Sequence, residues 1–346
     1  MSEAHEPAKP PHIGIRPEWL ALRTEAALEP DLPIIDAHHH LWEFPDKRYR
    51  AQDLLDDLAS GHNIRATVFV ECKTHYDTDG PAERASAGEM RFALAEAREA
   101  AALGTSTRVG AAFVGNVDLT LGEAAGAALD HLMDASEGRL SSIRNIAVWH
   151  ADPTVRPSAA TPPPRLLLDP SFQAGIAQLA PRGIAFDAWL IHTQLPELCQ
   201  LAGKFGDTPI VLNHVGGPLA LGPYRGHRDE VFAAWRDGIV TLSRCSNVHV
   251  KLGGFGMPLF GFGFERGELP PDSASVAEAI RPYVETCIEA FGASRCMFET
   301  NFPVDKGCFA YGIAWNAYKR VTATLTPSER AALFHDTAAR FYCIAD

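Results

Sequence analysis

Several features that mark other protein classes are missing from this sequence of 346 residues. No segment approaches the roughly 18 consecutive apolar residues of a membrane-spanning helix. Basic residues are outnumbered, with 31 Lys and Arg against 43 Asp and Glu, and the formal net charge of -12 argues against a nucleic-acid-binding surface, which needs clustered Lys and Arg. We therefore expect a chain that binds neither nucleic acid nor membrane.

Paired cysteines, a signal peptide and a nucleotide-binding loop are also missing. The seven cysteines are odd in number and scattered, with no Cys-x-x-Cys pair, so we expect reduced thiols. The first residues, MSEAHEPAKPPHIGIRPEW, lack the basic and then apolar segment of a signal peptide, and we expect a cytoplasmic protein. No Gly-x-Gly-x-x-Gly follows the first apolar run, which removes support for a dinucleotide-binding sheet.

What the sequence does contain is a regular alternation of strand and helix patterns. Short apolar runs predict eight strands, at residues 34–40, 66–72, 109–117, 142–148, 184–190, 209–215, 248–254 and 296–302. Helical spacing lies between them at residues 83–103, 119–133, 195–205, 228–244 and 275–291, and Thr326-Pro327-Ser328-Glu329 predicts the capped start of a last helix. This pattern predicts an α/β protein built as a single (β/α)8 TIM barrel over residues 33–346.

An N-terminal arm, residues 1–32, is predicted to precede the barrel and to lie over it. It is rich in Pro, Glu and Ala, and it holds one short amphipathic piece around Trp19 to Ala27. The first dozen residues are expected to be disordered, because chain termini are poorly ordered unless they are tied down.

The first predicted strand ends in a run of histidines, within PIIDAHHHLWE at residues 33–43. Side chains alternate faces along a strand, so we expect His38 and His40 to point the same way, with Asp36 behind them, and His39 to point the opposite way. Two imidazoles on one face can share a metal ion or a substrate oxygen. Two solvated histidines in a loop are the alternative, and the strand context favours a functional pair.

Polar residues also lie on later predicted strands or at their carboxyl ends. Buried strands seldom carry such groups without partners, because an unpaired charge in an apolar core is strongly unfavourable. We therefore expect these side chains to converge at one mouth of the barrel, where loops build active sites. Beyond His38 and His40, the set is Glu71, Arg144, His192, His214, Lys251, Glu299 and Asn301.

For several of these residues a structural role is the alternative. His192 could be a solvent-facing loop residue, and His214 could be a core histidine bonded to a backbone carbonyl. Arg144 and Lys251 could be internal ion-pair partners of the carboxylates in the set, with no contact to substrate. Asp187, in the middle of the fifth predicted strand, is expected to be structural.

Two long segments interrupt the alternation, at residues 149–170 and 255–273. The first is rich in Pro, and the second is rich in Gly, Phe and Pro. Both follow strands at the carboxyl face of the predicted barrel, where loops form lids or pocket walls. We expect residues 255–273 to form a pocket wall, because their phenylalanines would otherwise be costly exposed surface. For residues 149–170, a pocket wall and a plain surface loop are equal alternatives.

Four segments of the sequence carry a family resemblance. The run DAHHH at residues 36–40 resembles the His-x-His strand that opens the barrel of the amidohydrolase superfamily. The segments HTQLP at 192–196, NHVGGP at 213–218 and MFETNFP at 297–303 resemble its amidohydrolase-related branch, which includes sugar-acid lactonases, a pyrone dicarboxylate lactonase that works without metal, and some decarboxylases. The resemblance implies one divalent metal, Zn or Mn, at His38 and His40, with a metal-independent reaction as the alternative.

The sequence departs from the family pattern at the end of the eighth strand. In the family an Asp at that position is the general base that activates water, whereas this chain has Asn301. An amide cannot accept a proton at neutral pH and is a weak metal ligand, so the base is expected at Glu299 or Asp305, the nearest carboxylates. The loss of one ligand also weakens the case for a tightly held metal, since catalytic zinc usually has three protein ligands.

These observations predict a hydrolase that adds water to the acyl carbon of a small lactone, or of a related ester or amide. Arg144 and Lys251, with Glu71, would bind an anionic or hydroxylated small-molecule substrate, while His192 or His214 orients it or carries a proton. Two other functions remain open: a non-oxidative decarboxylase of the same branch, and a non-catalytic ligand-binding barrel, which the missing family Asp favours. The oligomeric state is also open, with a homodimer as one alternative.

Overall fold

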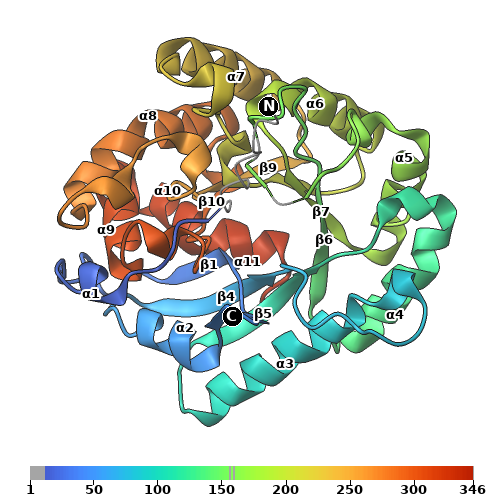
Figure 1. Ribbon diagram of the computed structural model, residues 1–346, viewed down its shortest axis with the longest axis horizontal. Coiled ribbons are helices and arrows are strands. Elements are labelled where there is room, and N and C mark those ends of the chain that lie inside the picture. The colour runs from blue at the N-terminus through green and yellow to red at the C-terminus, as the bar shows by residue number, and fades with distance from the viewer. Residues whose placement is uncertain (1–11, 156, 159, 346) are drawn as a thin grey trace, which may run out of the picture.

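The computed structural model describes residues 12–155, 157–158 and 160–345. An eight-stranded parallel sheet curls into a barrel, and helices surround it (Figure 1). Each strand pairs with the next one along the chain, in the order β1-β4-β5-β6-β7-β8-β9-β10. Their bounds are β1 Ile34–His39, β4 Ile64–Val70, β5 Arg108–Gly115, β6 Leu140–Ile146, β7 Ala185–Trp189, β8 Ile210–Leu212, β9 Val248–Leu252 and β10 Cys296–Phe298. The predicted (β/α)8 barrel is confirmed.

The barrel closes between β1 and the segment that follows β10. The His40 amide donates to the carbonyl of Phe302 at 2.7 Å, and the Asn301 amide donates to the carbonyl of His38 at 2.9 Å. These bonds belong to an isolated parallel bridge between His39 and Phe302, and they hold the backbone next to the histidines in place.

The five helices predicted from apolar spacing correspond to α3, α4, α6, α7 and α8, with shifts of a few residues at their ends, whereas α2, α5, α9 and α11 were not predicted. Their bounds are α1 Pro17–Leu20, α2 Ala51–Leu58, α3 Ala87–Ala102, α4 Ala125–Ala135, α5 Pro170–Ile176, α6 Leu195–Lys204, α7 Arg228–Leu242, α8 Ser273–Phe291, α9 Tyr311–Val321, α10 Pro327–Ala331 and α11 Thr337–Phe341. The capping box at the start of α10 is present, because Thr326 accepts from the Glu329 amide and Glu329 accepts from the Thr326 amide. Among the described residues, no helix is both long and apolar enough to cross a membrane.

Several element boundaries differ from the prediction for local backbone reasons. The strand predicted to run to residue 215 ends at Leu212, because His214 and Val215 adopt φ of 52° and 47°. The strand predicted to run to residue 302 ends at Phe298, and Asn301 has φ of 57°. A small antiparallel hairpin, β2 Trp42–Phe44 with β3 Lys47–Tyr49, was not predicted, because its strands are only three residues long.

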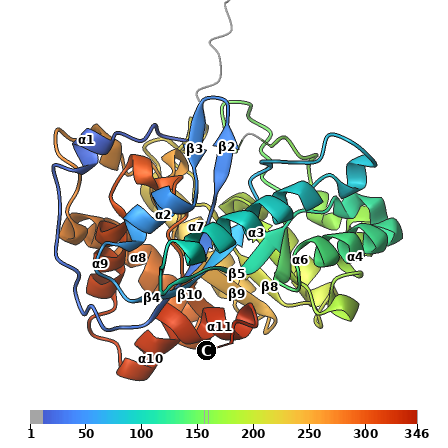
Figure 2. The same cartoon turned by 90° about the horizontal axis from the view of Figure 1, so that it is seen from below.

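The core has two layers. Inside the barrel, Ile35, Val68, Val114 and Met297 pack together, and Tyr342 enters this cluster from the segment after α11. Larger side chains fill the space between the strands and the surrounding helices. Figure 2 shows the β2–β3 hairpin at one end of the molecule and α11 at the other, which places the C-terminal segment at the amino-terminal end of the barrel.

The part of the N-terminal arm that the structure describes lies against the barrel. The Trp19 indole donates to the carbonyls of Gly267 and Glu268, each at 3.1 Å, and the Glu25 carboxylate accepts from the amide and hydroxyl of Ser273. Only Pro17–Leu20 is helical, so the amphipathic piece around Trp19 to Ala27 is mostly irregular. Residues 1–11, where disorder is predicted, lie outside the described residues.

Candidate active site

A bulge in β1 decides which histidines face the interior of the barrel. The pairing of β1 with β4 shifts between Asp36 and His39, so three steps along β1 match two along β4. Asp36 and His39 therefore both lie on the outer face, where Asp36 accepts from the Thr300 and Tyr311 hydroxyls at 2.6 and 3.0 Å. The prediction that Asp36 lies behind His38 on the same face is wrong, because simple alternation does not allow for the extra residue.

His38 and His40 lie on one face and His39 on the other. The Nε2 atoms of His38 and His40 are 3.2 Å apart, and both rings are buried. The His39 ring points away from them and contacts the Thr67 hydroxyl at 2.8 Å.

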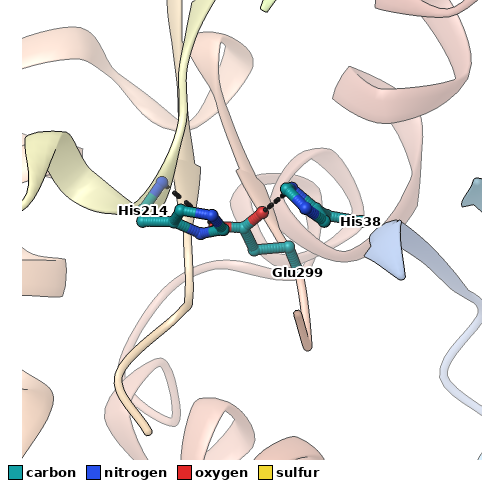
Figure 3. Close-up of side chains that lie close together, drawn as sticks. All are labelled: His38, His214 and Glu299. Carbon is teal, nitrogen blue, oxygen red and sulfur yellow. Dashed lines mark hydrogen bonds and ion pairs between the residues drawn. The ribbon is translucent and has the colours of Figure 1, made fainter. Parts of the chain in front are cut away.

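Glu299 joins His38 to His214 across the barrel (Figure 3). Its carboxylate lies 2.8 Å from Nδ1 of His38 and 2.7 Å from Nδ1 of His214, and it also accepts from the His214 amide at 3.1 Å. A carboxylate only accepts hydrogen bonds, so Nδ1 of His214 carries hydrogen. Glu299 is completely buried behind the two rings. Its Oε1 accepts both bonds from His214, whereas its Oε2 lies close to His38 but has no hydrogen-bond partner among the described residues.

Two glycines make room for this arrangement. A Cβ at Gly253 would lie 2.4 Å from Cγ of Glu299, and a Cβ at Gly254 would lie 2.6 Å from Nδ1 of His214. A side chain at either glycine position would displace Glu299 or His214 and disturb the contact between them. Gly253 and Gly254 directly follow β9. The sequence prediction missed their role because a Gly-Gly pair at the end of a strand usually indicates a turn.

Two of the interior histidines, His40 and His214, present Nε2 as an acceptor. His40 Nδ1 lies 2.8 Å from the carbonyl of Val70, so this nitrogen is protonated, as it is in His214. Burial lowers the pKa of His38, His40 and His214, and nearby cations lower the pKa of His38 and His40 further. At neutral pH the three rings are therefore neutral. In His40 and His214 Nδ1 is bonded to an acceptor and Nε2 is unprotonated, which is the state required of a metal ligand or a proton acceptor.

Two buried ion pairs flank the histidines. Arg144 donates from Nε to the Glu71 carboxylate at 2.7 Å, and its Nη1 lies 3.4 Å from Nε2 of His38. Lys251 donates to the Asp187 carboxylate at 2.7 Å, and its Nζ lies 3.4 Å from Nδ1 of His38. Both cations thus sit beside His38 with their charge already matched by a carboxylate.

The site opens into a pocket of about 250 Å³ at the carboxyl end of the barrel. Of the predicted site residues, His40, Glu71, Arg144, His214 and Asn301 line it. His38, Lys251 and Glu299 lie beneath these residues and contact them. Other lining residues, which the prediction did not name, include Trp42, Lys73, Ile146, Trp189 and Val304.

Both long loops reach the pocket, though not as expected. Pro157 and Ser158 of the first loop line it, which favours the pocket-wall alternative for residues 149–170. From residues 255–273 only Met257 lines the pocket. The phenylalanines of that loop stack on one another and on Tyr283 of α8, so the expectation that they form the pocket wall is wrong. They avoid exposure by packing against a neighbouring helix.

His192 and Asp305 do not face the pocket. His192 lines a different cavity, between α6 and α7, where its ring lies 5.3 Å from that of Tyr224. The Asp305 carboxylate is buried and accepts from the Gly256 amide and from Nδ2 of Asn301, each at 2.8 Å. Burial raises the pKa of Asp305 well above its usual value. The geometry gives neither residue direct access to a substrate in this pocket.

The donor set suits a divalent metal. His38, His214 and Glu299 offer ligand atoms within 4.8 Å of one another. Nε2 of His38 and Nε2 of His40 are 3.2 Å apart, close to the roughly 3.3 Å between two imidazole nitrogens bound tetrahedrally to one zinc ion. Two unprotonated nitrogens at that distance repel each other unless a cation or a proton lies between them. Imidazole nitrogens suit zinc, and the Glu299 carboxylate is a ligand type that suits manganese.

Known proteins resemble this chain over most of its length. An amidohydrolase from Burkholderia multivorans, solved with bound zinc, is 23% identical with a TM-score of 0.69, covering 90% of this chain and 99% of its own. A 5-carboxyvanillate decarboxylase from Novosphingobium aromaticivorans, complexed with manganese, is 12% identical with a TM-score of 0.55, covering 93% and 98%. These two structural similarities show that the folds are alike.

Two further proteins are similar to this chain in sequence over most of their length. An uncharacterized protein of Sinorhizobium fredii is 32% identical over 336 residues, which is 90% of this chain and 99% of the relative. An L-fucono-1,5-lactonase of Burkholderia ambifaria is 28% identical over 90% of this chain and 95% of its own. The amidohydrolase family model matches residues 35–344, and the chain therefore belongs to the amidohydrolase family.

Proposed function

We propose that this protein is a hydrolase that opens a small lactone, or a related ester or amide, by adding water at the mouth of the barrel. The observation that carries the proposal is the histidine cluster: His40 and His214 each have Nδ1 bonded to an acceptor, which leaves Nε2 unprotonated, and Nε2 of His38 lies 3.2 Å from Nε2 of His40. Such nitrogens can bind a metal, accept a proton from water, or do both in turn. The distant L-fucono-1,5-lactonase relatives support a lactone as the substrate class.

In this proposal His214 accepts the proton from water. His214 lines the pocket, and Glu299 behind it holds its tautomer and would stabilise the imidazolium that forms. Glu299 itself is completely buried and does not line the pocket, which favours a positioning role over the role of general base. Asp305 is less suited, because it is enclosed by Asn301 and Gly256.

One divalent ion, zinc or manganese, would be held by His38 and His40 and would polarise the substrate carbonyl. Arg144 offers a second source of positive charge, since its Nη1 lies 3.4 Å from Nε2 of His38. That contact supports the metal-independent alternative. In either case Arg144 and the exposed Lys73 at the pocket would bring an anionic substrate to the site.

Elemental analysis of freshly purified protein, combined with a lactone panel assayed before and after chelation, tests the proposal. We expect lactone opening in the parent and its loss in His214→Ala, with the fold retained. Carbon dioxide release from aromatic acids without lactone opening would establish the decarboxylase alternative. Ligands that bind and are recovered unchanged from every assay would establish a non-catalytic binding barrel.

A further inference from the structure

A second cavity lies at the opposite end of the barrel from the candidate active site. It has a volume of about 410 Å³ and is lined by residues at the amino-terminal ends of several strands and by residues 340–343 at the end of the chain. Figure 2 places α11, which contains Arg340, at the end of the molecule away from the β2–β3 hairpin. The polar side chains that line this cavity are Arg139, Ser141, His249, Arg340, Tyr342 and Cys343.

The cavity is basic in a chain with a net charge of -12. Its lining contains Arg139 and Arg340, and it includes no Asp or Glu among the described residues. Arg139 donates to the carbonyl of Gly110 at 2.9 Å, and Arg340 makes two long contacts, at 3.3 and 3.4 Å. In the part of the chain that the structure describes, neither guanidinium has a carboxylate within ion-pair distance. No direct ion pair among these residues therefore neutralises either charge.

His249 adds an unsatisfied polar atom to the same cavity. Its Nδ1 is buried and has no hydrogen-bond partner within the described ranges, while its ring packs against Phe341 at 4.9 Å. Buried polar atoms are normally paired, whereas the wall of this cavity, which also holds two arginines, contains an unpaired nitrogen.

We propose that this cavity binds a phosphate group, carried by a small phosphate monoester. A guanidinium presents its N–H groups in a fork that matches phosphate oxygens, and the two positive charges match a dianion. The cavity is larger than inorganic phosphate requires, and Leu140 and Phe341 give the remaining space an apolar wall suited to the organic part of an ester.

The site connects to the candidate active site through the barrel interior. Tyr342, which lines the cavity, lies with its hydroxyl 3.2 Å from both oxygens of Asp187, and Asp187 holds Lys251 beside His38. Tyr342 is thus three contacts from His38, through Asp187 and Lys251. The binding proposal does not depend on the proposed function, and it can be tested without an enzyme substrate.

Calorimetric titration of the full chain with inorganic phosphate and with ribose 5-phosphate, at constant ionic strength, tests the site. We expect one equivalent bound per chain, and a loss of at least about tenfold in affinity in Arg340→Gln, because charge-assisted hydrogen bonds are among the strongest in proteins. Arg340 is exposed, so this variant should fold normally. Arg139→Gln should weaken binding similarly, and Arg340→Lys should recover part of it.

Two control variants separate this site from other positive charges. Arg236→Gln removes an exposed arginine of α7, and Lys73→Met removes the exposed lysine of the active-site pocket; both should bind phosphate like the parent. Tighter binding of ribose 5-phosphate than of inorganic phosphate supports the ester as ligand, and the reverse order supports free phosphate at the same site. No binding of either probe, binding unchanged in Arg340→Gln, or binding lost in Lys73→Met would overturn the proposal.

Discussion

Replacing Glu299 with Gln tests whether the carboxylate positions the two histidines. In the parent, one oxygen accepts from Nδ1 of His214 at 2.7 Å and the other lies 2.8 Å from Nδ1 of His38. A glutamine keeps one acceptor oxygen but places an amide NH₂ against the second imidazole. That ring must move, or it must shift its hydrogen from Nδ1 to Nε2. Either change removes one Nε2 acceptor from the cluster.

The expected loss is about 10²- to 10⁴-fold in kcat/KM, because a wrong tautomer or an absent base costs that much in comparable sites. If a metal is bound, its affinity should fall about 10- to 100-fold, the usual effect of losing a hydrogen-bond partner behind a ligand. The free energy of unfolding should change by less than about 2 kcal/mol, since the substitution is nearly isosteric and also removes a buried charge.

The assay compares kcat/KM on a verified substrate, metal content and urea unfolding for Glu299→Gln and for the matched variant Glu89→Gln. Glu89 is equally buried, but it accepts from the backbone amides of Cys72 and Thr74, which a glutamine oxygen can still do. Glu89→Gln should therefore retain activity. Full activity and unchanged metal content in Glu299→Gln would refute the reasoning and leave Glu299 as an internal ion-pair partner, with Asp305 as the next residue to test.

Four further predictions concern the surrounding residues. His38→Ala should abolish activity, whereas His39→Ala should lower stability and leave kcat within about threefold, because His39 lies on the outer face. The opposite order of sensitivity would mean that the strand register is wrong. Arg144→Lys should raise KM for an acidic lactone by about tenfold and change neutral lactones less, since Lys cannot reproduce the fork; equal kinetics on an anionic substrate would remove Arg144 from the site. Burial, and then Glu71, raise the pKa of Glu89 to about 8, so the folded chain binds this proton more tightly than the unfolded chain and loses stability as pH rises from about 4.5 to 8. Glu89→Gln should flatten that slope in urea titrations at pH 5 to 9, and a slope identical to the parent's would contradict the assignment. Asn301→Asp should increase metal retention measured by elemental analysis, and unchanged metal content and activity would mean that position 301 supplies no ligand.

Much of the fold could be predicted from the sequence because strands and helices bury their apolar faces with different periods. The apolar runs that become β4 and β5, VFV and VGAAFVG, have few polar interruptions, as expected for strands covered on both faces. The predictions failed where a few residues with left-handed backbone ended a strand, as at His214 and Asn301. Periodicity contains no information about such single-residue turns.

The candidate site was only partly predictable, for a different reason. Polar side chains on buried strands need partners, so we predicted that they converge. His38, His214 and Glu299 do lie together. Which partner each residue finds depends on strand register and on bulges, so the pairing of Lys251 with Asp187 and the outward position of Asp36 could not be derived from alternation. Trp42 reaches the pocket from a hairpin too short to give a pattern.

The amide at position 301 and the buried carboxylate at position 299 are two parts of one arrangement. Asn301 lines the pocket and donates from Nδ2 to Asp305, which leaves its Oδ1 as the only remaining acceptor on that side chain. An amide oxygen can orient a water molecule but cannot take its proton. The proton must then pass to a neutral imidazole, and His214 is the one that both lines the pocket and has a carboxylate behind it to stabilise the resulting charge. The loss of the family Asp is thus compatible with hydrolysis, provided that the His214 and Glu299 pair carries the proton that the Asp would have taken.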